Sequence, residues 1–146
     1  FMTKLDEREN QLKENTKRNE DYLKMFEKSL EEKQLTAKTI RKHVSNIDFY
    51  LNDYLTYYDE IIKMKDGTQY TGSFLGDWFI RKAMWASKSS IKEMSSSLKK
   101  FYEYMSALGF VKISDYQEMC YEIKDNMDLY LENLEDYDNG TFDFLF

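Results

Sequence analysis

Basic and hydroxyl side chains gather at two places where helices are expected to begin. The first cluster contains Thr36, Lys38, Thr39, Arg41, Lys42 and His43, and the second contains Ser87, Lys88, Ser89, Ser90 and Lys92, with Lys99 further along the same helix. The N-terminus of a helix attracts phosphate through its free N–H groups and its dipole. Lys, Arg, Ser and Thr side chains add charge and hydrogen bonds to such a contact. Both clusters are therefore candidate contacts for a nucleic-acid backbone, unless the hydroxyls serve only as helix caps and the lysines only as solvated surface.

Other kinds of chemistry find little support in the sequence. The glycines at 67, 72 and 76 fit neither a phosphate-binding loop nor a dinucleotide fingerprint. The single histidine, His43, and the single cysteine, Cys120, match no zinc spacing and no nucleophile–base pair. Acidic pairs are common, but none marks a pocket that would separate their pKa values. We therefore expect no enzyme activity, no metal and no cofactor, and we expect Cys120 to be a core thiol.

Length and composition favour a helical fold. The chain has 146 residues, 42% of them hydrophobic, with no proline and only 5 glycines, which suits one domain built from long helices. We predict an all-α fold, a single bundle of about five helices. Since no long apolar run and no signal peptide is evident, we expect a cytoplasmic protein that does not contact membranes.

The hydrophobic pattern places the helices. The first is predicted to end near Lys33, the second to begin at Thr36 as N-cap, and a third to run from a Ser73 cap to about Trp85. A fourth is predicted from the serines at 87–90 to a Gly109 cap, and a fifth from a Ser114 capping box. Asp66-Gly67 predicts a short hairpin near residues 62–71. We expect Trp78 and Trp85 to be at least half buried.

Charge and pattern together suggest three parts. Residues 1–21 are a charged N-terminal helical extension, residues 22–112 form the bundle, and residues 113–146 form an acidic helix and tail packed on it. The net charge is -6, but the last 34 residues hold ten acids against Lys124 alone, so the preceding part is slightly basic. The acidic end is either a solvated helix face that aids solubility or a cover that competes with nucleic acid for the basic face.

Two short stretches carry a family resemblance. Leu-Thr-Ala-Lys-Thr-Ile occupies residues 35–40, and Ser-Lys-Ser-Ser-Ile at 87–91 is followed by Leu-Lys-Lys-Phe-Tyr-Glu-Tyr-Met at 98–105, before Gly109. Over about residues 22–112 the chain resembles the SAM-like core-binding domain of tyrosine recombinases, the phage integrases. That resemblance implies a four-helix module that grips duplex DNA with its second and fourth helices. The family's catalytic Arg and His-x-x-Arg pattern has no counterpart here, because His43 is followed by Val-Ser-Asn.

The sequence thus predicts a non-enzymatic DNA-binding module that clamps the backbone of duplex DNA weakly, through the helices that begin at Thr36 and Ser87. The alternative is a helical module of the same fold that binds a protein partner or itself and does not bind DNA. The hydrophobic tail at residues 141–146 would suit that alternative. The sequence leaves open the DNA site, the oligomeric state and the parent system.

Overall fold

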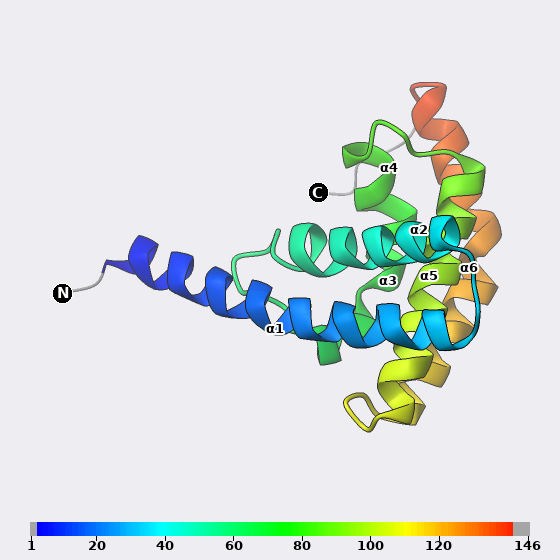
Figure 1. Cartoon of the computed structure of the whole chain (residues 1–146). Helices are drawn as coiled ribbons and strands as arrows, with labels where there is room; N and C mark the ends of the chain where they lie inside the picture. The colour runs from blue at the N-terminus through cyan, green and yellow to red at the C-terminus, as the bar shows by residue number, and fades with distance from the viewer. Residues whose placement is uncertain (1–2, 142–146) are drawn as a thin grey trace. The chain divides into compact units, whose positions relative to one another are not determined.

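The computed structural model describes residues 3–141, and it is all-α over that range, as predicted (Figure 1). The six α-helices are α1 (Lys4–Glu32), α2 (Ala37–Asp48), α3 (Thr71–Ser73), α4 (Phe79–Lys82), α5 (Lys88–Ala107) and α6 (Ile113–Asp138). Two π-helical segments, η1 (Phe49–Tyr54) and η3 (Phe74–Trp78), and one 3₁₀-helix, η2 (Met64–Gln69), complete the regular structure. No helix in the described part is long and apolar enough to cross a membrane.

The contacts divide the chain into two compact units, residues 1–67 and 68–146. The predicted divisions at residues 22 and 113 stay predictions, as does the SAM-like type of the bundle. The hydrophobic tail after residue 141 lies outside the described residues.

In the first unit, α1 and α2 form an antiparallel hairpin (Figure 1). Thr36 is the N-cap of α2, as predicted, and its hydroxyl accepts a hydrogen bond from the Thr39 backbone nitrogen at 3.2 Å. Gln34 has a φ of 63° in the short connection, which lets the chain reverse without a glycine. The second helix continues as η1 rather than as regular α-helix. The unit buries Phe26, Leu30, Ile40, Ile47, Leu51 and Leu55.

Arg8 holds the segment that follows η1 against α1. Its Nη1 donates to the carbonyl of Asp59 at 2.7 Å, and its Nη2 donates to the carbonyls of Thr56 and Tyr58 at 2.8 and 3.1 Å. Three carbonyls near the end of a helical stretch are thereby satisfied by one guanidinium. Tyr50, at the start of η1, donates its hydroxyl to the carbonyl of Gly67. The predicted hairpin near residues 62–71 is wrong, because η2 occupies this stretch.

In the second unit, α5 and α6 pack side by side as antiparallel helices (Figure 1). α5 begins at the predicted serine cluster, where Ser87 forms a full capping box with Ser90, and Gly109, at a φ of 83°, follows its end as predicted. The shared core contains Ile91, Met94, Leu98, Phe101, Tyr102 and Met105 of α5 with Met119, Ile123, Tyr130 and Leu134 of α6. The predicted Ser114 cap is wrong, because α6 already begins at Ile113, after Lys112.

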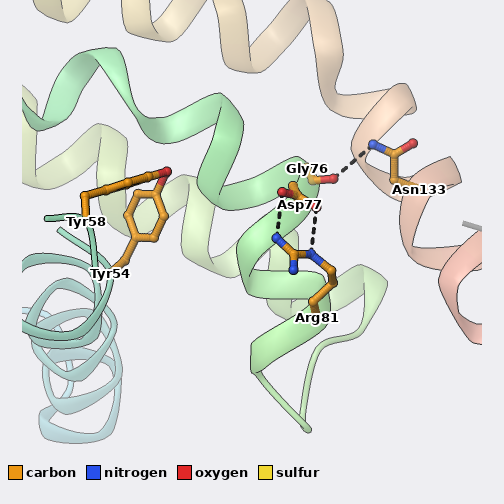
Figure 2. A network of polar contacts seen from close by, with 6 residues as sticks. All are labelled: Tyr54, Tyr58, Gly76, Asp77, Arg81 and Asn133. Atoms are coloured by element: carbon orange, nitrogen blue, oxygen red, sulfur yellow. Dashed lines mark hydrogen bonds and ion pairs between the residues drawn. The ribbon is translucent and has the colours of Figure 1, made fainter. Parts of the chain in front are cut away.

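Gly76 allows η3 to lie close to α6. A Cβ at this position would lie 2.7 Å from Cδ1 of Tyr130, a separation that real Cβ atoms do not adopt. The Asn133 side chain donates to the carbonyl of Gly76 at 3.0 Å, which Figure 2 shows. The close approach of backbone to a tyrosine ring therefore requires glycine here.

The predicted third helix is present as α3, η3 and α4, which follow one another without a gap from Thr71 to Lys82. It ends before Trp85, and this changes the environment of that tryptophan. Ser73 makes no capping bond, so its predicted role is wrong. Trp78 is buried as predicted, at 8% exposure, but Trp85 is 59% exposed. The reason is that α4 ends at Lys82, and the following Ala83 is extended, so Trp85 stands in a loop and touches the Phe79 ring only edge-on.

The two cores predict the cost of truncating an aliphatic side chain. Ile47 and Leu98 are both fully buried, so Ile47→Ala and Leu98→Ala should each lower the free energy of unfolding by about 2–5 kcal/mol, because a cavity adds to the lost transfer energy. Urea denaturation followed by circular dichroism measures the change. Leu108→Ala is the matched control, since this side chain is 44% exposed and its loss should cost less than about 1 kcal/mol. Equal losses at Leu98 and Leu108 would contradict the described packing of α5.

Candidate nucleic-acid interface

The start of α2 presents basic side chains to solvent while its hydroxyls pair with each other. Lys38, Arg41 and Lys42 are exposed. The Thr36 hydroxyl donates to the hydroxyl of Thr39 at 2.9 Å and accepts from the Thr39 backbone nitrogen. Both threonine hydroxyls therefore take part in the cap. The basic side chains are the remaining candidates for contact with an anion.

His43 differs from its neighbours in this cluster. It is only 5% exposed, because α2 turns this position toward the interior between Ile40 and Ile47, which are also buried. An imidazole in that position is not available to a phosphate group in this conformation. We therefore leave His43 out of the interface proposed below.

No acidic residue interrupts the sequence from Lys33 to Ile47, which contains four basic residues. Neither Lys38 nor Arg41 forms an ion pair with any described residue. The positive end of the helix dipole lies at the same place. Charge and dipole thus favour an anion at the start of α2.

The start of α5 is built in the same way. The Ser90 backbone nitrogen donates to the Ser87 hydroxyl at 3.0 Å, and the Ser87 backbone nitrogen donates to the Ser90 hydroxyl at 2.7 Å. The Ser89 hydroxyl lies 3.1 Å from that of Ser87. These three serines satisfy one another and the first turn of the helix, so their hydroxyls already have partners.

The lysines of this second cluster differ in their surroundings. Lys88 and Lys92 are exposed. Lys99 is half-buried and lies about 16 Å from Lys88 along the helix axis. The Nζ of Lys88 lies 3.8 Å from Oε2 of Glu135 on α6, and both side chains are exposed. Lys92 forms no ion pair with a described residue. The acidic helix thus already contacts one lysine of the cluster.

Residues that the sequence did not single out lie next to this cluster. The stretch from Trp78 to Lys92 again contains four basic residues and no acid. Arg81 is neutralised by Asp77, with its Nε and Nη2 each 2.9 Å from a carboxylate oxygen (Figure 2). Met84 is fully exposed and Trp85 is largely exposed, both within three residues of Ser87. Their exposure could not be foreseen, because the helix that precedes them ends earlier than its hydrophobic pattern suggests.

The structure therefore groups the predicted residues into two surfaces, one in each unit. We call Thr36, Lys38, Arg41 and Lys42 the α2 surface, and Ser87, Lys88, Ser89 and Lys92 the α5 surface. Each has its hydroxyls engaged in a cap and its basic side chains in solvent.

Groups suited to catalysis are not assembled in the described residues. No cluster of His, Cys, Asp or Glu there could hold a metal ion. Cys120 is free and half-buried rather than in the core. Its neighbour Tyr116 has a pKa raised well above the usual range, first by burial and then by the hydrogen bond with Cys120. Burial, and after it the charge of Glu122, raises the pKa of Tyr130. Both phenols therefore stay protonated at neutral pH.

The chain was compared with family models, curated proteins and solved structures. The chain matches no family model, no curated protein and no solved structure.

The capping bonds predict that the two serines Ser87 and Ser89 differ in their effect on stability. Ser87→Ala removes the acceptor for the Ser90 backbone nitrogen and should lower the free energy of unfolding by about 1 kcal/mol. Ser89→Ala, which removes only the contact with Ser87, should change it by less than about 0.5 kcal/mol. Thermal and urea denaturation of both variants measure the difference. A Ser87→Ala variant as stable as the parent would contradict the capping role.

Proposed function

We propose that the chain is a non-enzymatic DNA-binding module, which contacts the phosphate backbone of duplex DNA through the α2 and α5 surfaces. One observation carries the proposal: two capped helix starts each lie in a stretch of about 15 residues that has four basic residues and no acid. The resemblance to the core-binding domain of phage integrases favours the same two helices. DNA recombination is the setting that this resemblance suggests.

The chemistry of these surfaces sets the mode of binding. Lysine and arginine contact phosphates without reading base sequence, so the binding we propose is largely independent of sequence. The chain as a whole carries a net charge of -6, which opposes association at long range. Binding should therefore be weak and strongly dependent on salt.

Charge reversal at three exposed residues tests the proposal. Lys38→Glu, Arg41→Glu and Lys92→Glu together should abolish binding to a 20-base-pair duplex, as measured by fluorescence anisotropy at low and moderate salt. In each of the three single variants, the lost phosphate contact should reduce the slope of log K against log salt by about 0.9. The melting temperature should not fall, since acidic residues near a helix N-terminus interact favourably with the dipole.

A matched triple variant on α1 controls for net charge. Lys13→Glu, Lys17→Glu and Lys28→Glu change the total charge by the same amount at exposed positions, and should leave most of the affinity. If both triple variants bind alike, the α2 and α5 surfaces are not the contact, and the proposal fails.

The Lys88–Glu135 ion pair predicts that the acidic helix restrains the α5 surface. Glu135→Gln frees Lys88 and should tighten binding about two- to fivefold at low salt, the range expected for one exposed ion pair. The gain should fade as salt rises, because ions screen exposed charges. Glu132→Gln removes the same charge from α6 at another exposed position. Equal gains from both variants would indicate an effect of net charge alone, without a specific role for the pair.

A second candidate function rests on a different observation. Met84 and Trp85 form an exposed apolar tip between α4 and α5, and an exposed tryptophan is a frequent anchor in protein interfaces. We propose a protein partner, or a second copy of the chain, for this tip if DNA does not bind. Sedimentation of the parent and of Trp85→Ala tests self-association. During the DNA titration, quenching of Trp85 fluorescence would instead place DNA near the α5 surface, with the buried Trp78 as the unaffected reference.

A further inference from the structure

The connection between α4 and α5 leaves two large apolar side chains next to each other in solvent. Met84 is fully exposed and Trp85 is largely exposed, and we call these two residues the apolar tip. Adjacent exposed apolar side chains of this size are typical of a contact surface. Lys88, three residues after Trp85, forms its ion pair with Glu135, which stands one turn before the end of α6. The apolar tip therefore lies close to the end of α6.

Contacts along α6 lead to the same placement. Gly72 lies beside the hydroxyl group of Tyr130, and Gly76 lies beside the Cδ1 atom of the same ring. The side chain of Asn133, further along α6, donates to the carbonyl of Gly76. Because helix side chains lean toward the N-terminus of their helix, this order shows that α3, η3 and α4 run in the same direction as α6. The end of α4 therefore lies beside the last turns of α6 (Figure 1).

The backbone turns sharply where α6 ends. Gly140 has a φ of 75°, and its nitrogen donates to the carbonyl of Tyr137 at 3.1 Å. The nitrogen of Thr141 donates to the carbonyl of Asp136 at 2.7 Å. These two bonds form a Schellman motif, which satisfies the last carbonyls of the helix and changes the direction of the chain. The residues after Thr141 therefore start at the end of the unit that carries the apolar tip, and they do not continue the axis of α6.

Residues 142–146 match the apolar tip in reach, composition and charge. Their sequence is Phe-Asp-Phe-Leu-Phe. Five extended residues span at most about 17 Å, whereas packed helices lie about 8–10 Å apart. Asp143 is their single charge, and the stretch from Trp78 to Lys92 has four basic residues and no acid. The last turns of α6 carry acids instead, so charge directs this segment toward the connection between α4 and α5.

We propose that residues 142–146 dock on the apolar tip of the same chain. Their phenylalanine rings cover the indole of Trp85 and the thioether of Met84, which are both favourable partners for aromatic rings. Asp143 lies on the side of Lys82 and Lys88. A partner protein or a second copy of the chain must then displace this segment before it reaches the tip, whether or not the chain binds DNA.

Quenching of Trp85 fluorescence by acrylamide tests the contact in the full chain. The variant Trp78→Phe leaves Trp85 as the single tryptophan, because the sequence contains two. In this background, Phe142→Ser, Phe144→Ser and Phe146→Ser together should about double the quenching constant, because the indole loses its cover. Its emission should also shift to longer wavelength.

A matched triple variant on α6 controls for the loss of apolar surface. Ile113→Ser, Tyr121→Ser and Leu129→Ser alter three exposed side chains and should leave the quenching constant unchanged. If the variant in residues 142–146 is quenched no more than this control, the proposal is wrong. A quenching constant that falls as the protein concentration rises would also overturn it, because residues from a second copy would then cover the tip.

Cleavage by chymotrypsin gives a second measurement, which keeps Trp78 and so does not depend on the folding of the Trp78→Phe variant. Trp85→Ser should speed cleavage after Phe142 and Phe144 about threefold or more, because proteolysis follows the population of the undocked segment. Phe110→Ser, an exposed position beyond the other end of α5, should leave that rate unchanged. Mass spectrometry measures the products. Equal rates in Trp85→Ser and the parent chain would contradict the contact.

Discussion

Backbone groups at helix ends must find partners, and side chains provide them at the starts of α1, α2 and α5. Each helix leaves four N–H groups and four carbonyls without partners inside the helix, and the chain has no proline and few glycines with which to end a helix. Thr3 with Asp6, Thr36, and Ser87 with Ser90 cap α1, α2 and α5. Arg8 satisfies three carbonyls beyond η1. These polar side chains therefore help to fix where α1, α2 and α5 begin, whereas α6 begins after Lys112 without a side-chain cap.

That role limits what the candidate interface can offer. The threonines and serines that first suggest phosphate ligands form hydrogen bonds with the backbone and with one another. They therefore stabilise the helix starts, and their hydroxyls are already engaged. What remains for a ligand is the dipole, the free N–H groups of the first turn and the basic side chains. A surface of this kind attracts phosphate through charge and gives little discrimination between sequences. The same caps thus hold the helix starts in place and leave the proposed DNA contact with little basis for sequence specificity.

Features set by neighbouring residues were predictable from the sequence, and features set by distant ones were not. The Thr36 cap, the start of α5 at the serines at 87–90 and the Gly109 terminus depend on three or four residues, and each was predicted correctly. The contact of Arg8 with Asp59 joins residues 51 apart, and the packing of Gly76 on Tyr130 joins two helical segments. Neither leaves a periodic signal. The hydrophobic pattern also does not reveal the π-helical segments η1 and η3 or the end of α4 at Lys82. Because the chain is extended at Ala83, Trp85 lies beyond the helix and was wrongly placed in the core.

The buried polar groups on α1 differ in whether they find hydrogen-bond partners. Asn19, Asn52 and Asp48 form a chain of hydrogen bonds, whereas Asn15, on the same face of α1, lacks an acceptor although it is buried to the same extent. Leucine would fill a similar volume at position 15 without an unsatisfied donor, so the fold gains nothing from asparagine there. On the surface, Glu135 of α6 lies 3.8 Å from Lys88 of α5. In the DNA complex proposed above, this exposed ion pair would compete with a phosphate contact of Lys88.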